Sequence, residues 1–528
     1  MCRCHADARC HGCRHAVDRR RFLQTSATTV TTAVATATVG GLSSPAAAAD
    51  ETPRRKVRVA AVFLANTTVR ESWPYPGFDA AGRQREILAL LAKGCPEIEF
   101  IPVSVEKPAD AQKALAMKDD VDGYLVYLVT LDWGLGGTVI QIGQLGKPLL
   151  VADEFLGGCG TFLTRYSELC DRQIPAAAVS TTRLSDLATV AGQFASVRAP
   201  GATPASFARQ CEQVYRETFP ARGDMRCTED RLSLTDVGRC VERFRRSRFL
   251  IVGRGRGGQE EEFLGARARY VDFDELSSFY EKVDRDEAAE WGGRWRRRAT
   301  RVMEPQPDAI DKAGVVYLAT KLLMEQHGTD SVTMNCLGGF AAGKLPAYPC
   351  LGFMQILDDG GQGVCEAMPD DTLSMLMARI LTGRPGYVSD PALDTSKNQV
   401  VYAHCVATTR PFGPQGQANG FRIRTLHNRD PRGACAESLL PAGYMTTSFR
   451  TNVARKQMIL HQAKAVGTLD SDHGCRTKLV GEVCGDIGKL FQQWSRFGWH
   501  RVTVYGDLKQ PLAEFGKALG LEVIEEAV

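Results

Sequence analysis

Two carboxylates and two histidines in the second half of the sequence are residue types that bind divalent cations. Glu366 ends a short glycine-rich run, and Asp390 follows a turn that contains Pro385 and Gly386. His404 ends a β-like run, and His500 precedes another. Carboxylate oxygens and an imidazole nitrogen with open positions suit Mn²⁺ or Mg²⁺ better than a closed zinc site. Such a cation stabilises an oxyanion while a nearby carboxylate moves a proton, so the pattern predicts metal-assisted acid–base chemistry.

Each of these residues also has a purely structural interpretation. Glu366 can be a charge at a helix N-terminus, and Asp390, which precedes Pro391, can be a turn former. His404 lies between apolar residues and can be a hydrogen-bonded core histidine, while His500 can be the exposed start of a strand. Taken one at a time, the residues leave both interpretations open.

The elements that would position these residues alternate over the first two thirds of the chain. Apolar, β-branched runs such as Val57–Leu64, Val121–Val129 and Arg248–Val252 predict strands. Ala80–Lys93 and Pro307–His327 have helical spacing of their apolar residues. Strands that alternate with helices favour parallel, doubly wound sheets.

The sequence pattern changes from alternating strands and helices to short β-like runs near residue 398. Short β-like runs are separated there by Gly, Pro and Asn, and include Gln399–Val406, Gly420–Thr425, Met458–Leu460 and Arg501–Tyr505. The predicted fold class is therefore α/β, with two Rossmann-like doubly wound domains followed by a C-terminal β-rich, barrel-like domain. We place the first α/β domain at residues 57–185, the second at 192–390 and the β-rich domain at 398–528.

Four segments around the candidate ligands resemble the L-fucose/L-arabinose isomerase superfamily, and they are closer to its fucose branch. They are Cys365–Glu366, Pro385–Asp390, Ala403–Cys405 and His500–Asp507, in this order. The resemblance covers nearly all of the chain that follows the first 49 residues. It is sharpest from about residue 330 to the end.

The resemblance implies a metal-dependent aldose–ketose isomerase that acts on a sugar such as L-fucose or L-arabinose through a cis-enediol. It implies that Glu366, Asp390 and His500 bind Mn²⁺, or Mg²⁺ or Co²⁺ in its place. Glu366 and Asp390 would also be the catalytic acid and base, so the carboxylate ligands fall in the second predicted domain. His404 would be a fourth ligand or would support a ligand. The resemblance further implies a homo-oligomer, a trimer or a hexamer, with sites between subunits.

Three residues near these segments are candidates for contact with the sugar. They are Tyr444, His473 and Trp499. One departure from the family concerns the same region, because the family carries an Asp two residues after the ligand Glu and this chain carries Met368. Asp370 is a candidate substitute. This departure leaves a non-catalytic, sugar-binding relative of the isomerases as an alternative.

A glycine-rich turn suggests a second alternative, an exported NAD-dependent sugar oxidoreductase. Gly253–Gly258 reads GRGRGG after a predicted strand and fits the G-x-G-x-x-G pattern, with Asp272 about 20 residues on. Glu260–Glu262 follow at once and would repel a pyrophosphate. The glycine-rich turn is therefore weaker evidence for a function than the four segments that resemble the isomerases.

Residues 1–49 resemble a twin-arginine signal peptide. Arg19–Arg21 precede Phe-Leu-Gln, an Ala/Thr/Val-rich stretch follows, and Ala46–Ala49 form a small-residue cleavage site. The stretch is too poor in Leu and Ile for a membrane span. We expect export by the twin-arginine route, cleavage after Ala49, a periplasmic or extracytoplasmic location, and no membrane anchor after cleavage.

The net charge gives no support to a nucleic-acid-binding protein, and the cysteine spacing gives none to a cysteine metal motif. The formal net charge of +4 comes from the leader, since acidic and basic residues balance in the rest, and this gives no support to nucleic-acid binding. Of the 17 cysteines, those before Arg19 would leave with the leader. The others have no paired metal-site spacing, and Cys336 and Cys405 lie in apolar runs typical of buried thiols.

Overall fold

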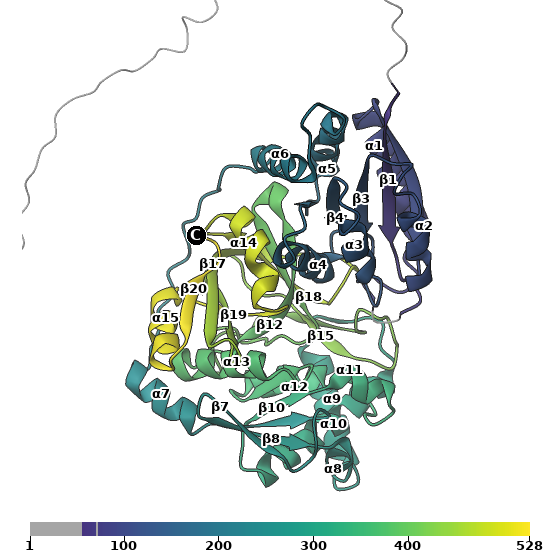
Figure 1. Cartoon of the computed structure of the whole chain (residues 1–528). Helices are drawn as coiled ribbons and strands as arrows, with labels where there is room; N and C mark the ends of the chain where they lie inside the picture. The colour runs from purple at the N-terminus through teal and green to yellow at the C-terminus, as the bar shows by residue number, and fades with distance from the viewer. Residues whose placement is uncertain (1–54, 70–71) are drawn as a thin grey trace, which may run out of the picture. The chain divides into compact units, whose positions relative to one another are not determined.

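A parallel sheet forms near the start of the computed structural model, which describes residues 55–69 and 72–528. Its strands are β1 (Val57–Leu64), β2 (Ile98–Val105), β3 (Gly123–Leu128), β4 (Leu149–Asp153) and β5 (Ala177–Val179). They lie in the order β2-β1-β3-β4-β5, and every neighbouring pair is parallel (Figure 1). The strand order reverses between β1 and β3, as in doubly wound sheets. The leader predicted at residues 1–49 lies outside the described residues.

Both faces of this sheet are buried. Val59, Ala61 and Phe63 of β1 belong to an apolar cluster with residues of α1 (Ala80–Gly94), α5 (Leu184–Ala191) and α6 (Pro204–Glu217). The alternate residues Ala60, Val62 and Leu64 join residues of α2 (Ala111–Leu115), α3 (Gly137–Gly143) and α4 (Cys159–Asp171). Burial on both faces explains why these strands are almost continuously apolar instead of alternating with polar residues.

A second, mostly parallel sheet has the order β11-β10-β6-β8-β7. Its strands are β6 (Arg248–Val252), β7 (Glu260–Phe263), β8 (Ala266–Val271), β10 (Ser331–Met334) and β11 (Gln362–Cys365), and β7 is the antiparallel member. The helices that pack with it include α7 (Val237–Arg245), α9 (Arg285–Arg298), α10 (Pro307–Gln326), α12 (Cys350–Asp358) and α13 (Pro369–Thr382). The strand predicted at Arg248–Val252 is confirmed residue for residue.

The glycine run Gly253–Gly258 joins β6 to the hairpin strand β7 and does not lead into a helix. Gly253, Gly255 and Gly258 have φ values of 74°, 74° and 81°, in the left-handed region that favours glycine. The glycines therefore shape a tight turn. Residues 253–271 are all described, and among them there is no helix N-terminus of the kind that binds a pyrophosphate. The glycine-rich turn therefore lacks the helix on which the nucleotide-binding alternative depends.

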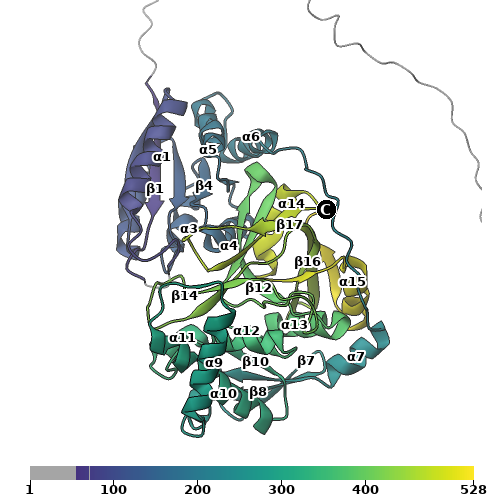
Figure 2. The ribbon, with the colours of Figure 1, turned by 180° about the vertical axis from the view of Figure 1, so that it is seen from behind.

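The C-terminal part is a closed barrel, as the β-rich texture of the sequence predicts. Within the described residues the strands β12 (Tyr387–Asp394), β13 (Gln399–His404), β16 (Met445–Asn452), β17 (Gln457–Thr468), β18 (Thr477–Val483) and β19 (Arg501–Tyr505) follow the order β16-β19-β12-β13-β18-β17. Antiparallel pairing of β16 with both β19 and β17 closes the ring. β20 (Glu522–Glu525) pairs in parallel with the first four residues of β17 (Figure 1), and Figure 2 shows the ring strands β12, β16 and β17 from behind.

These observations confirm a mixed α/β fold with a parallel sheet and a closed C-terminal barrel. The domain boundaries at residues 57–185, 192–390 and 398–528 stay a prediction, because the described chain from Arg55 onward packs as one unit. Within residues 55–69 and 72–528, no helix is both long enough and apolar enough to cross a membrane.

Candidate active site

The register of the barrel brings three of the candidate residues to neighbouring strands. β12 lies between β19 and β13. Asp390 of β12 pairs with Ala403 of β13, so His404 is one residue beyond the pair. Ser389 pairs with Arg501, which places His500 beside Asp390 on the other neighbour. Asp390 is therefore part of a barrel strand, which rules out the alternative that it is a turn former.

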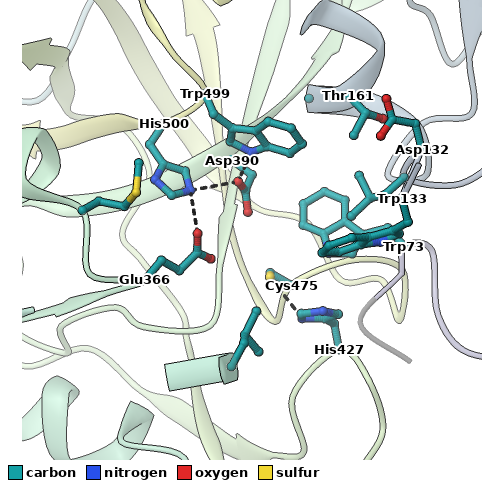
Figure 3. Close-up of a pocket in the computed structure, with 14 residues that line it drawn as sticks. Trp73, Asp132, Trp133, Thr161, Glu366, Asp390, His427, Cys475, Trp499 and His500 are labelled. Carbon is teal, nitrogen blue, oxygen red and sulfur yellow. Dashed lines mark hydrogen bonds and ion pairs between the residues drawn. The ribbon is translucent and has the colours of Figure 1, made fainter. Parts of the chain in front are cut away.

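Glu366 reaches the same place from the second sheet. It follows β11 directly, and both Glu366 and Ala367 have positive φ values, 70° and 52°. A non-glycine residue in this region costs on the order of 1–3 kcal/mol, and such strain concentrates at functional sites. The carboxylate of Glu366 lies 3.7 Å from Nε2 of His500 (Figure 3). It also lies 3.6 Å from Nε2 of His404. The two carboxylates thus come from different sheets.

Asp390 completes the cluster. Its Oδ1 lies 3.1 Å from Nε2 of His500, and it also accepts a hydrogen bond from the indole N–H of Trp499. The Trp499 ring lies against Gly160 of α4. The structure therefore brings together the residues proposed as metal ligands, Glu366, Asp390 and His500, with His404 beside them.

Asp371 is a residue of this site that the sequence analysis missed. It lies on α13, is fully buried, and accepts a hydrogen bond from Nδ1 of His500 at 2.6 Å. Arg450 of β16 donates its Nε–H to the other oxygen at 2.7 Å. Asp370, the candidate substitute for the family carboxylate, instead accepts the backbone N–H of Val453 at 3.0 Å. The carboxylate that reaches the cluster is one residue further on than expected.

The charges of the cluster support one another. Burial opposes ionisation of Glu366, but His404 and His500 outweigh it and lower the pKa of the Glu366 carboxyl. Burial likewise opposes the charged form of His500, yet Asp371 and Asp390 raise the pKa of His500 well above its ordinary value. Burial lowers and Glu366 raises the pKa of His404, with a net rise. A bound cation would compete with these protons, so metal affinity would fall at low pH.

The donor set fits a divalent cation. One oxygen of Glu366 and one nitrogen each of His404 and His500 lie within 4.8 Å of one another. His404 is 3 % exposed, and neither of its ring nitrogens has a hydrogen-bond partner among the described residues. A buried imidazole whose nitrogens make no hydrogen bond is costly unless something binds it. Two carboxylates and two imidazoles are ligands that suit Mn²⁺, Mg²⁺ or Co²⁺.

A cavity of about 380 Å³ opens onto the cluster. Its lining includes Glu366, Asp390 and His500, and the large side chains Trp73, Trp133, Trp499, Leu131, Leu337 and Met368 (Figure 3). A pocket of this size with mostly apolar walls and a few convergent polar groups is typical of a small-molecule site. The side chain of Met368, at the position of the family carboxylate, faces this space.

Tyr444 and His473 are not among the residues that line this cavity. Tyr444 packs against Phe412 and Tyr505, and His473 packs against aromatic rings that include Tyr75. Trp499 does line the cavity. The sugar-binding roles of Tyr444, His473 and Trp499 stay predictions. Of these three residues, the structure places Trp499 beside the candidate metal ligands.

Comparison with known proteins gives a distant, partial match. No protein-family model matches the chain. The chain is similar to proteins named sulfoquinovose isomerase from Priestia aryabhattai and from Priestia megaterium, each 27% identical over 276 residues. The match spans 50% of this chain and 59% of each relative. Over half of its length, this chain is therefore similar to proteins that are named as sugar isomerases.

Proposed function

We propose that this protein is a metal-dependent aldose–ketose isomerase that acts on a sugar such as L-fucose or L-arabinose. The observation that carries the proposal is the meeting of Glu366, His404 and His500 within 4.8 Å, with Asp390 3.1 Å from His500, at one cavity. The similarity to named isomerases supports the reaction class.

The reaction requires removal of a proton from C2 of the aldose and its return to C1, through a cis-enediol. Glu366 is the base in our proposal, because its lowered pKa keeps it ionised near neutral pH. Asp390, which accepts a hydrogen bond from Trp499, accepts the proton of the substrate's O2 hydroxyl and returns it to O1. A divalent cation bound by Glu366, Asp390, His500 and His404 would stabilise the oxyanion of the enediol.

The cavity also bears on the substrate. Its aromatic walls offer flat apolar surfaces to the C–H face of a sugar ring, and Asp132, Glu366 and Asp390 line it with carboxylates. Asp132 is paired with Arg165 at 2.7 Å, and Glu366 and Asp390 lie beside His404 and His500, so these carboxylates already have counter-charges. We propose a neutral aldose because the sequence resembles the fucose branch of the family, and sulfoquinovose, for which the relatives are named, is the competing candidate.

The decisive experiment measures ketose formation from L-fucose, L-arabinose, D-arabinose, L-rhamnose and sulfoquinovose, with Mn²⁺ and then with EDTA. We expect turnover of a neutral sugar that EDTA abolishes, and a loss of at least about 100-fold in Glu366→Gln and His500→Ala. Glu290→Gln is the control, since Glu290 lies in an exposed pair with Arg294 and should keep full activity.

Full activity in both site variants would refute the assignment of the site. Binding of metal and sugar without turnover of any sugar would instead identify a non-catalytic, sugar-binding relative. In that case Met368 would be the first residue to examine, because it occupies the position of the family carboxylate and lines the cavity.

We also propose export by the twin-arginine route, on the evidence of Arg19–Arg21 and the small residues before Asp50. Replacement of Arg19 and Arg20 by lysine should retain the precursor in the cytoplasm. Intact-mass measurement of the exported protein should show an N-terminus at Asp50, and an unprocessed, cytoplasmic product in the wild type would contradict the proposal.

Assembly into a trimer or hexamer is the remaining part of the proposal. It rests on the family resemblance. Light scattering coupled to size-exclusion chromatography measures the mass directly, and a monomer with full isomerase activity would contradict it.

A further inference from the structure

We propose that Cys405, His427 and Cys475 bind a thiophilic metal ion such as Zn²⁺. This second site has no ligand in common with Glu366, Asp390, His404 and His500, which we call the isomerase cluster. Nδ1 of His427 lies 3.7 Å from Sγ of Cys405 and 3.4 Å from Sγ of Cys475. All three ligand atoms lie within 4.8 Å of one another, and all three residues are buried. The proposal stands on this geometry and does not depend on the proposed isomerase activity.

The fold brings the three side chains together from separate segments. Cys405 directly follows β13, and Cys475 lies two residues before β18. β13 and β18 are paired, with His404 opposite Thr477, so the ends that carry the two cysteines meet. His427 comes from the connection between β14 (Phe421–Arg424) and β15 (Cys435–Ser438). The pairing of strands fixes two of the ligands relative to each other.

The distances match those that zinc requires. Zn–S and Zn–N bonds are about 2.3 Å and 2.0–2.1 Å, so tetrahedral geometry separates a sulfur from a nitrogen ligand by about 3.5 Å. The separations of 3.4 Å and 3.7 Å from Nδ1 of His427 to the two sulfurs therefore need almost no rearrangement. Two thiolates and an imidazole are soft ligands, which favour Zn²⁺ over the cations suited to the carboxylates of the isomerase cluster.

The fourth position of this site faces the cavity. His427 and Cys475 both line the space onto which Glu366 and His500 open (Figure 3). The Cys435 thiol also interacts with Cys405, but it donates to the carbonyl oxygen of Thr425 at 3.4 Å and is not among the three residues whose ligand atoms lie within 4.8 Å of one another. A water or an oxygen of a cavity ligand would therefore complete the coordination, as at zinc sites with three protein ligands.

The full-length protein, purified without chelator, is the material for the test. We expect about one equivalent of zinc per chain, released when an organomercurial blocks the thiols and detected with a chromogenic chelator. Replacement of zinc by Co²⁺ should give the near-ultraviolet charge-transfer band of a cobalt–thiolate bond. This band distinguishes the site from the isomerase cluster, whose proposed ligands contain no sulfur.

The variants separate this proposal from the proposed function. Cys405→Ser and Cys475→Ser should lose the cobalt–thiolate band, whereas Glu366→Gln should keep it while losing isomerase activity. Cys211→Ser is the matched control, because Cys211 is a buried free cysteine of the first sheet's core and should leave the band unchanged. Circular dichroism checks that each variant folds, and the organomercurial release from the wild type decides the question if the serine variants do not.

Three results would overturn the proposal. The first is wild-type protein that neither contains zinc nor takes up Co²⁺ with a thiolate band. The second is a band that persists undiminished in both Cys405→Ser and Cys475→Ser. The third is a Cys405–Cys475 disulfide in non-reduced peptide mass spectra of metal-free protein, which would assign the pair to a covalent cross-link.

Discussion

Nδ1 of His500 lies 2.6 Å from a carboxylate oxygen of Asp371, 129 residues earlier in the chain. Burial opposes ionisation of Asp371, but Arg450 and His500 outweigh it and hold the pKa of the Asp371 carboxyl far below its ordinary value. An ionised carboxylate only accepts hydrogen bonds, so Nδ1 of His500 must carry the proton. Nε2 is then the nitrogen that faces Glu366 and Asp390, which is the orientation a metal-binding histidine needs.

We expect Asp371→Asn to weaken Mn²⁺ binding by about 10- to 100-fold, because the histidine loses the carboxylate that fixes its orientation. Asp371 acts through His500, so it is a positioning residue. Competition with a fluorescent chelator measures the affinity of the apo protein for Mn²⁺. This readout does not move if Asp371 serves only to stabilise the fold.

Asp370→Asn is the control for that experiment. Asp370 is the neighbouring carboxylate on α13. It accepts the backbone N–H of Val453 and lies 3.9 Å from Arg450, whereas the His500 ring pairs with Asp371. Its replacement should leave Mn²⁺ affinity unchanged. Equal weakening in both variants, at equal melting temperatures, would contradict the role given to Asp371.

A substitution at Gly160 tests whether Asp390 depends on its hydrogen bond from Trp499. A Cβ placed on Gly160 would lie 2.7 Å from Cε2 of the Trp499 ring. That separation is too short for packed atoms, so Gly160→Ala must push the ring away and disturb its hydrogen bond to Asp390. We expect isomerase activity to fall by about tenfold or more, with about 1–3 kcal/mol lost in the free energy of unfolding from overpacking.

Gly137→Ala is the matched substitution. Gly137 lies in α3, and a Cβ there would meet no atom within 4 Å. Alanine is the better helix former by up to about 1 kcal/mol, so the variant should be slightly more stable and fully active. Unchanged activity in Gly160→Ala, with the protein folded, would show that Asp390 does not depend on the position of Trp499.

Much of the fold could be predicted because its local signals agree with its tertiary structure. Arg501–Tyr505 is β-branched and apolar, and it forms β19 with the same bounds. The strand that carries Asp390 was harder to predict, because Pro385 and Gly386 before it and Pro391 after it are turn formers. Pro391 pairs with Tyr402 of β13 but lies beyond the pairing of β12 with β19, which ends at Ser389, and a proline is tolerated at such an incompletely paired position of a strand.

The parts of the site that the sequence did not predict depend on register between distant segments. Asp370 and Asp371 are indistinguishable in the sequence, and only the turn of α13 decides which of them reaches His500. His427 is 22 residues from Cys405 and 48 from Cys475, far outside the spacing of a zinc motif. Only the pairing of β13 with β18 brings these ligands together.

The last prediction concerns acid stability and a buried carboxylate that is not one of the proposed metal ligands. Glu526 is fully buried between Arg501, at 2.7 Å, and His461, also at 2.7 Å. Burial opposes its ionisation, but Arg501 and His461 outweigh it and lower the pKa of Glu526 from 4.5 to about 2. A pKa lowered in the folded state stabilises the protein above the unfolded pKa. This stabilisation, on the order of 3 kcal/mol, is lost as the pH falls from about 4.5 to about 2.

Glu526→Gln should therefore be less stable than the wild type at pH 7, by about 3–5 kcal/mol, since Arg501 is left buried without its counter-charge. The difference should shrink as the pH falls towards 2, where the wild-type carboxyl takes up its proton. Urea unfolding of both proteins at a series of pH values measures it. Glu525→Gln is the control, because Glu525 is 40% exposed and pairs with Lys509 at the surface, so its loss should change stability by less than about 1 kcal/mol. A constant difference between Glu526→Gln and wild type from pH 7 to pH 2 would show that the Glu526 carboxyl does not titrate with folding.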